Sequence, residues 1–214
     1  MAVIFVTGIG TGVGKTLASA VIAEALGADY WKPVQTGVPA AGDATDGSDA
    51  AYVAARLSRP RIHPEVYRFA LPASPHIAAR AEGVEIDLER IAAAVPRSGD
   101  LVVEGAGGLL VPLNDEDFMA DLAQRLDAQV ILVSRNYLGS INHSLLTARV
   151  AREWGLNIAG WIFNDHFGDY EEEIVRWSGY PVLGRMPLTE NPDAAFVRTL
   201  AAEWRPALTK MLKR

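Results

Sequence analysis

Short apolar runs alternate with helical patterns along almost the whole chain. The helical patterns cover residues 15–26, 48–57, 117–126, 141–154, 170–177 and a tail from about residue 194, and the apolar runs between them are AVIFVT, DYWKPV, LVVEG, QVILVS, IAGWIFN and PVLGRMP. This alternation predicts parallel strands joined by crossover helices, because parallel neighbours need long connections. Several runs are apolar at consecutive positions, which is typical of a sheet covered by helices on both faces.

Two segments break the alternation. Residues 37–47 are rich in Gly, Ala and Asp and predict a mobile loop, whereas residues 59–75 carry four prolines and predict an irregular path into another helix. Loops of this length in a compact domain are often functional. The sequence shows neither a linker nor an internal repeat, and we therefore expect residues 1–214 to form a single α/β domain.

Composition narrows the classes of function. A net charge of −6 argues against a nucleic-acid surface, and the absence of cysteine excludes disulfides, thiolate catalysis and cysteine-based metal sites. No run approaches the ~20 apolar residues that cross a bilayer, and the first residues lack the basic flank of a secretory signal. We expect a cytoplasmic protein with neither nucleic-acid nor membrane partners.

The strand pattern also predicts where a ligand binds. In open parallel sheets, ligands lie beyond the carboxyl ends of the strands, so the residues that follow each strand become neighbours in space. The segments that follow the predicted strands are residues 7–16, 32–37, 104–108, 134–142, 164–166 and 187–193. We therefore expect the functional residues among these segments.

The strongest chemical signal is TGIGTGVGKT, residues 7–16, directly after the first apolar run. Gly8 is followed by five residues and then by Gly14, Lys15 and Thr16, a spacing one residue longer than that of the usual P-loop. Alternating glycines let backbone N–H groups face an anion at the positive end of the next helix. A dinucleotide fingerprint would instead require glycine at Val13. We predict a Rossmann-like P-loop NTPase fold, in which the nucleotide is bound by Thr11, Gly12, Val13, Gly14, Lys15, Thr16 and Leu17.

Charged residues follow other strands. A lysine at the position of Lys32 can simply reach solvent, but two lysines that meet in one crevice would both neutralise a transferring phosphoryl group. Glu104 ends the strand LVVE, and Asp49 lies in the first turn of a helix that Ser48 can cap. Together with the Thr16 hydroxyl, these two carboxylates predict a Mg²⁺ site.

Seven motifs then occur in order over nearly the whole chain: GIGTGVGKT, WKPVQTG, SPHIAAR, VEGAGGLLVPL, LGSINH, FND and PLTENPD. In combination they resemble the dethiobiotin synthetases. The resemblance implies an ATP-dependent ligase that makes dethiobiotin from 7,8-diaminopelargonate and CO₂, through a carbamate and a carbamic-phosphoric anhydride. It also implies that Lys32 and Lys15 are catalytic and that Thr36 contacts the substrate.

The resemblance extends to both ends of the site. It implies further cofactor contacts from two groups of residues. Those that follow Glu104 are Gly105, Ala106 and Gly107. Those around the adenosine are Asn164, Asp165, Pro187, Leu188, Thr189 and Asp193. Whether Glu190 or Asp193 contacts the nucleoside stays open. The resemblance also implies that the distal carboxylate of the diamine binds to a turn contributed across a homodimer interface. This turn consists of Leu138, Gly139, Ser140, Ile141 and Asn142. We expect Ser140 to cap the helix there, and His76 either to line the substrate approach or to have a structural role.

Two other classes of P-loop protein remain as alternatives. A switch ATPase of the partitioning or maturation type commonly carries an additional lysine early in the loop, where this chain has Ile9, Gly10 and Thr11. A small-molecule kinase would require a lid with arginines, and the sequence shows no such cluster. Both alternatives therefore rank below the ring-closing ligase.

Overall fold

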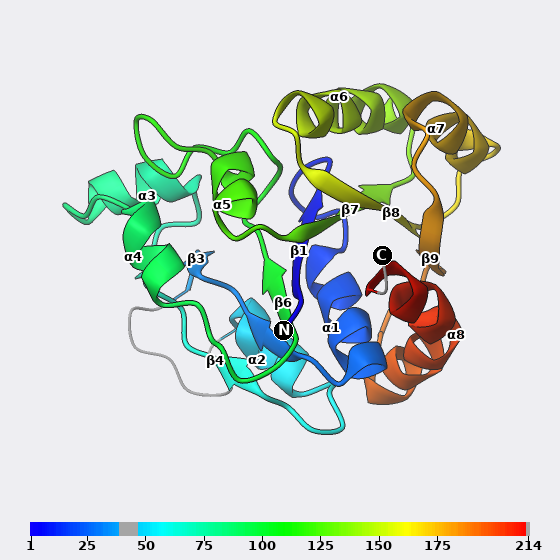
Figure 1. Cartoon of the computed structure of the whole chain (residues 1–214), viewed down its shortest axis with the longest axis horizontal. Helices are drawn as coiled ribbons and strands as arrows, with labels where there is room; N and C mark the ends of the chain where they lie inside the picture. Colours follow the sequence, from blue (N-terminus) through cyan, green and yellow to red (C-terminus); the bar gives the residue numbers. More distant parts are fainter. Residues whose placement is uncertain (39–46, 213–214) are drawn as a thin grey trace.

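The computed structural model describes residues 1–38 and 47–212. Within that part of the chain, seven parallel strands form the main sheet, in the order β4-β2-β6-β1-β7-β8-β9 (Figure 1). Their bounds are β1 Val3–Gly8, β2 Asp29–Trp31, β4 Ile62–His63, β6 Leu101–Glu104, β7 Gln129–Arg135, β8 Asn157–Asn164 and β9 Val182–Met186. The predicted loop over residues 37–47 falls largely outside the described residues.

Helices cover both faces of this sheet (Figure 1). One face packs against α1 (Lys15–Leu26), α2 (Asp49–Ala54) and α8 (Ala194–Leu212), and the other against α5 (Met119–Arg125), α6 (Ser140–Glu153) and α7 (Tyr170–Ser178). Side chains of the central strand alternate between the two cores: Ile4 and Val6 join the core of α1 and α8, and Phe5 joins the other. The predicted parallel sheet with helices on both faces is confirmed.

Several short elements lie outside the predicted pattern. β3 (Val34–Thr36) and β5 (Tyr67–Phe69) form a separate parallel pair, and α4 (Leu88–Ala93) precedes β6, whereas α3 (Pro75–Ala81) follows the proline-rich segment as expected. The run DYWKPV, predicted as one strand, is therefore divided between two sheets. Pro33 stands at the division and lacks the N–H that a continuing ladder would need. As a result, Lys32 lies where the chain leaves the main sheet.

Glycines set the boundaries of two helices at the ligand-binding edge. α1 spans Lys15–Leu26 as predicted, between Gly14 with φ 99° and Gly27 with φ 63°. The prediction that Ser140 caps α6 is wrong. The cap residue is Gly139, whose φ of 105° lies in the left-handed region that favours glycine, and Ser140 is the first helical residue.

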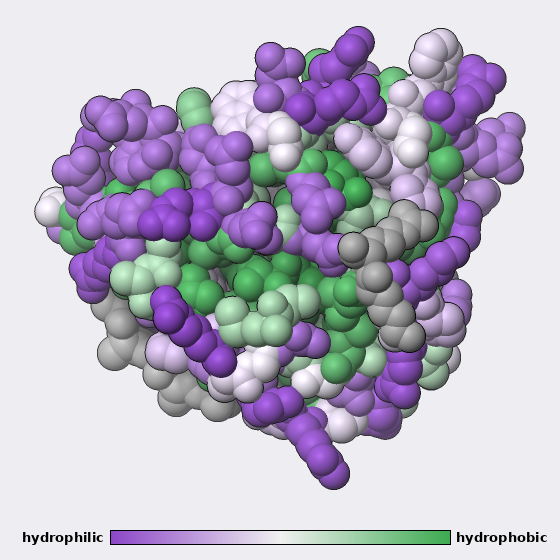
Figure 2. Space-filling model, in the orientation of Figure 1, coloured by the Kyte–Doolittle hydropathy of each residue, from purple (hydrophilic) through white to green (hydrophobic). Residues whose placement is uncertain are grey.

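Polar residues cover most of the rim of the face in Figure 2, and apolar residues gather near its centre. Large aromatic side chains fill the interior, where Trp31, Trp161 and Trp204 are buried. The burial of these aromatic rings helps to hold the sheet and its helices together.

Among the described residues, no helix combines the length and the apolar character that crossing a bilayer requires.

Candidate active site

The predicted phosphate loop connects β1 to α1 and packs against the end of β8. Gly12 and Gly14 have φ values of 72° and 99°, which glycine adopts without strain. A Cβ atom on Gly14 would come within 2.6 Å of the Asn164 amide nitrogen, and that nitrogen donates a hydrogen bond to the Val13 carbonyl at 3.0 Å. The loop and a predicted nucleoside residue are thus direct neighbours.

Lys15 is a buried cation at the start of α1. Its side chain is turned back onto the loop, where Nζ donates a hydrogen bond to the Gly10 carbonyl at 2.7 Å. Burial lowers the pKa of Lys15 from 10.5 to about 8, although the negative charge of Glu104 acts in the opposite direction. Charged acceptors bind an ammonium more strongly than a neutral carbonyl does. A phosphate in the loop would therefore be a better partner for Lys15 than Gly10.

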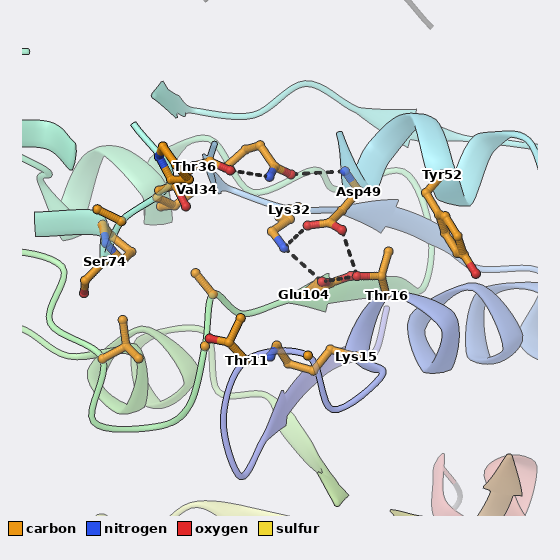
Figure 3. Close-up of a pocket in the computed structure, with 18 of the residues that line it drawn as sticks. Thr11, Lys15, Thr16, Lys32, Val34, Thr36, Asp49, Tyr52, Ser74 and Glu104 are labelled. Carbon is orange, nitrogen blue, oxygen red and sulfur yellow. Dashed lines mark hydrogen bonds and ion pairs between the residues drawn. The ribbon is translucent and has the colours of Figure 1, made fainter. Parts of the chain in front are cut away.

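Lys32 lies between two carboxylates (Figure 3). Its Nζ donates hydrogen bonds to Glu104 Oε1 at 2.9 Å and to Asp49 Oδ2. Burial acts to lower the pKa of Lys32, but the charges of Glu104 and Asp49 outweigh burial and raise it. Burial likewise acts to raise the pKa of Asp49, and the Lys32 ammonium outweighs it and lowers that pKa. The structure therefore holds Lys32 as an ammonium and Asp49 as a carboxylate.

Oxygen atoms of three predicted metal ligands converge beside Lys32. Thr16 Oγ1 lies 2.9 Å from Asp49 Oδ1 and 2.9 Å from Glu104 Oε1. Mg²⁺ prefers such hard oxygen donors and is usually bound by one or two carboxylates together with phosphate oxygens and water. No group of three or more His, Asp or Glu side chains in the described part of the chain is arranged to hold a metal. The Thr16 hydroxyl and the carboxylates of Asp49 and Glu104 are hard oxygen donors, so they fit a Mg²⁺ ion that arrives with a nucleotide.

Neighbouring elements hold these carboxylates in place. Ser48 caps α2 as expected, since its Oγ accepts a hydrogen bond from the Ala51 N–H at 3.1 Å. The Asp49 N–H donates to Gln35 Oε1 at 3.2 Å, which ties the start of α2 to β3. Glu104 is the last residue of β6 and is only 1% exposed. Both carboxylates therefore belong to ordered elements.

A cleft of about 810 Å³ joins the two lysines to the predicted substrate residue. Figure 3 shows Thr36 and Ser74 on one side of Lys32, Tyr52 on the other, and Thr11 and Lys15 below it. The predicted residues that line the cleft are Thr11, Gly12, Gly14, Lys15, Thr16, Leu17, Lys32, Thr36, Asp49, Glu104, Ala106 and Gly107. Val13 and Gly105 are buried beside it. One cleft thus holds both the phosphate loop and Thr36.

Among the predicted nucleoside residues, Asn164 lies next to the P-loop, and none of them lines this cleft. The N–H of Asp165 donates to the Met186 carbonyl at 3.0 Å, which brings the turn after β8 beside the segment from Pro187 to Thr189. Asp193 Oδ1 accepts from the N–H of Phe196 at 2.8 Å at the start of α8. The side chain of Asp193 therefore has a structural partner in the protein.

The predicted carboxylate-binding turn is separate from the cleft. Residues 138–142 span the start of α6 and supply none of the described residues that line the cleft of the same chain. Leu138 is 79% exposed, and Tyr137 beside it is also exposed. Within one chain, the structure does not bring this turn to the lysines.

Some residues of the site are absent from the sequence-based prediction. Val34, Gln35, Tyr52 and residues 72–75 also line the cleft, and Tyr30 contacts Glu104 from the core. Strand alternation gives one signal for Tyr30: Lys32 follows β2 directly and is two positions from Tyr30, so both side chains are expected on the same face. His76 Nδ1 lies 3.1 Å from Ser74 Oγ at the start of α3, which agrees with a structural role for that histidine.

A glycine-rich loop on the central strand, with lysines and carboxylates at the same edge of a parallel sheet, defines a P-loop nucleotide-dependent enzyme. A family profile described as an AAA domain matches residues 2–195. The chain is 48% identical over 180 residues to the ATP-dependent dethiobiotin synthetase of Cytophaga hutchinsonii, covering 84% of this chain and 85% of the relative. It is 45% identical to that of Sphingopyxis alaskensis, covering 89% and 93%. The chain belongs to the family of ATP-dependent dethiobiotin synthetases.

Solved structures of other P-loop proteins share the fold. A ParA family ATPase from Chlorobium tepidum superposes with a TM-score of 0.60 at 16% identity, covering 99% of this chain and 97% of its own. The MinD cell division protein of Aquifex aeolicus gives 0.60 at 14% identity, covering 100% and 98%. Identities this low show a common fold and carry no inference about activity.

Proposed function

We propose that this protein closes the ureido ring of dethiobiotin from 7,8-diaminopelargonate, CO₂ and ATP. One observation carries the proposal: buried lysines from two separate strand ends lie in one cleft with a set of oxygen ligands suited to Mg²⁺. Membership of the dethiobiotin synthetase family supports the choice of substrates. The reacting carbamate and phosphoryl groups are anionic, so this reaction needs a cleft that stabilises negative charge. These side chains provide such a cleft.

The chemistry requires charge stabilisation at every stage. One amine of the diamine adds to CO₂ and loses a proton, which gives a carbamate. A carbamate oxygen then attacks the γ-phosphorus, and the bond to the β–γ bridging oxygen breaks to release ADP. The second amine attacks the carbamate carbon, expels phosphate and loses a proton as the ring closes. Positioning and positive charge suffice for the phosphoryl transfer, and no side chain acts as a nucleophile.

The two lysines would act on the same phosphoryl group. Lys15 would leave the Gly10 carbonyl for the terminal phosphate oxygens, because a charged acceptor is the stronger partner. Lys32 would turn from Asp49 and Glu104 toward the carbamate and the γ-phosphate, with Thr36 holding the substrate beside it. Thr16, Asp49 and Glu104 would hold Mg²⁺, which neutralises phosphate charge when bound.

The remaining predicted residues would bind the outer parts of the two substrates. Asn164, beside the P-loop, would pair with adenine, and Asp165, Pro187, Leu188, Thr189 and Asp193 would surround the nucleoside. The turn at residues 138–142 would bind the carboxylate of a diamine held by the partner in a homodimer. Exposed apolar side chains on and before α6, Tyr137, Leu138 and Leu146, support an interface there.

Direct detection of the product tests this function. The protein is incubated with Mg-ATP, bicarbonate and 7,8-diaminopelargonate, and dethiobiotin is sought by mass spectrometry, with ADP measured in parallel. We expect dethiobiotin and ADP in equal amounts, both dependent on the diamine. ATP hydrolysis that is indifferent to the diamine, with no dethiobiotin formed, would contradict the proposal and favour a switch ATPase.

A further inference from the structure

The Glu104 carboxylate is held from two sides. Its Oε1 faces the cleft and accepts hydrogen bonds from Thr16 Oγ1 and Lys32 Nζ, each at 2.9 Å. Its Oε2 faces the core and accepts a hydrogen bond from the Tyr30 hydroxyl at 2.8 Å. The two oxygens of one carboxylate therefore have different tasks, and Tyr30 contacts only the oxygen that points away from the cleft.

Tyr30 is a rigid anchor for this hydrogen bond. It is completely buried in the middle of β2, paired with Ile62 of β4 on one side and with Val102 of β6 on the other. Its hydroxyl is the donor of this hydrogen bond, because a carboxylate oxygen can only accept. Glu104 has three rotatable side-chain bonds, whereas the ring of Tyr30 is fixed by packing.

We infer that Tyr30 is a positioning residue, whose hydroxyl orients the Glu104 carboxylate so that Oε1 faces Thr16 and Lys32. The inference rests on the proposed role of Glu104 as a magnesium ligand. Carboxylates that bind metals are commonly fixed by further hydrogen bonds, and loss of such a partner lowers metal affinity by about 10- to 100-fold. A tyrosine that only filled the core would affect stability and leave metal affinity unchanged.

A single hydroxyl can be removed to test this role. Tyr30→Phe deletes the donor and keeps the buried ring, and Tyr67→Phe is a matched control. Tyr67 is also buried, but its hydroxyl accepts a hydrogen bond from the Asp87 N–H at 2.9 Å and has no contact with Glu104. Circular dichroism and thermal unfolding of both variants report the cost to the fold.

The informative measurement is Mn²⁺ affinity, followed by electron paramagnetic resonance in the presence of a non-hydrolysable ATP analogue. We expect Tyr30→Phe to bind Mn²⁺ about 10-fold more weakly than the native protein, and Tyr67→Phe to match the native protein. In the product assay, Tyr30→Phe should need more Mg²⁺ for half-maximal rate and recover most of its rate at saturating Mg²⁺. Native Mn²⁺ affinity in Tyr30→Phe would overturn the inference.

A double-variant cycle separates a direct effect from a general loss of packing. Glu104→Gln should itself weaken Mn²⁺ binding, and adding Tyr30→Phe should weaken it no further, because the hydroxyl acts through the carboxylate. Additive losses in the double variant would overturn the inference. The Mn²⁺ experiment needs no diamine, so a failure to form dethiobiotin would reject the proposed function and leave the result for Tyr30 intact.

Discussion

Lys15 and Lys32 are both buried but are stabilised differently. Lys32 has two carboxylate partners, whereas Lys15 donates to a neutral carbonyl of its own loop. A buried charge that loses its partner is strongly destabilising, at about 3–5 kcal/mol. Lys32 therefore contributes to the stability of the folded protein as well as to the proposed chemistry, and a test of its role must separate the two.

We predict that Lys32→Ala lowers dethiobiotin formation at least about 10²-fold, because the variant loses a cation at the transferring phosphoryl group. Nucleotide binding should remain measurable, since the P-loop and Lys15 are unchanged. Product formation is measured by mass spectrometry, and binding by calorimetry with an ATP analogue.

The matched variant Lys32→Arg keeps a positive charge between Asp49 and Glu104, so it should unfold close to the native temperature. Lys210→Ala, an exposed lysine on α8, controls for the loss of any lysine. Full activity in a folded Lys32→Ala protein would reject the role assigned to Lys32.

The sequence predicts the residues at strand ends better than it predicts their supports. Lys15 and Thr16 belong to a loop motif, and Glu104 ends an apolar run, so local sequence suffices to single them out. The contact of Tyr30 with Glu104 joins positions 74 residues apart. It exists because β2 lies beside β6, and the order of strands in a sheet does not follow from their order in the chain.

The strand β2 carries charged groups with different tasks at its two ends. Lys32 follows its carboxyl end in the cleft, whereas Asp29 begins the strand at the opposite edge of the sheet. Asp29 is 2% exposed and binds the Ser98 hydroxyl at 2.8 Å, His63 Nε2 at 2.8 Å and the Arg61 guanidinium at 3.0 Å. These contacts join β2, β4 and the segment before β6, so Asp29 belongs to the support of the sheet.

We predict that Asp29→Asn lowers the free energy of unfolding at pH 7 by about 1–3 kcal/mol, because the buried donors around Asp29 lose a carboxylate acceptor. Burial acts to raise the pKa of Asp29, but hydrogen bonds from His63 and Ser98 and the charge of Arg61 outweigh it and lower the pKa. The stabilisation is therefore complete above the unfolded pKa of about 3.9 and is lost as the pH falls through the lower folded pKa.

Urea unfolding of both proteins at several pH values measures this effect. The difference in the free energy of unfolding between the native protein and Asp29→Asn should shrink as the pH falls below about 4. Asp115→Asn, at an exposed carboxylate, should change stability by less than about 0.5 kcal/mol. A difference for Asp29→Asn that grew toward low pH would contradict the assignment.

Long elements with clear boundaries are predictable from the sequence, and short ones are not. Both ends of α1 are predicted to the residue, because Gly14 and Gly27 enclose a long helical pattern. In the structure both glycines have a left-handed φ. β3, β4 and β5 have two or three residues each, too few to show an alternation. Their pairing depends on Pro33 and on contacts with distant segments. The cleft wall that β3 supplies, with Gln35 bound to the start of α2, is therefore visible only in the structure.

The whole molecule shares its fold with proteins of another kind. The ParA family and MinD structures superpose over nearly the full chain, so the fold alone does not separate a ligase from a switch ATPase. Under the proposed function, the features that favour a ligase are Lys32 and Thr36, which line the cleft beside the P-loop. The first loop of this chain also lacks an early lysine.

The proposed homodimer predicts a change in mass when its apolar surface is altered. Leu146 is 57% exposed on α6, and Leu146→Asp should place a charge in the interface and convert a dimer to a monomer. Light scattering coupled to size exclusion measures the mass. Val84→Asp, at an exposed position after α3, should leave the dimer intact. A native protein that is monomeric at all working concentrations would contradict the dimer and the role of residues 138–142.

The central claim is that Lys15 and Lys32 meet around one phosphoryl group. A crystal structure with Mg²⁺, a non-hydrolysable ATP analogue and 7,8-diaminopelargonate tests it most directly. The account predicts both Nζ atoms within hydrogen-bond distance of γ-phosphate oxygens, with Lys15 released from Gly10 and Lys32 turned away from Glu104. A Lys32 ammonium that stays on Asp49 and Glu104, out of reach of the γ-phosphate in the filled site, would contradict it.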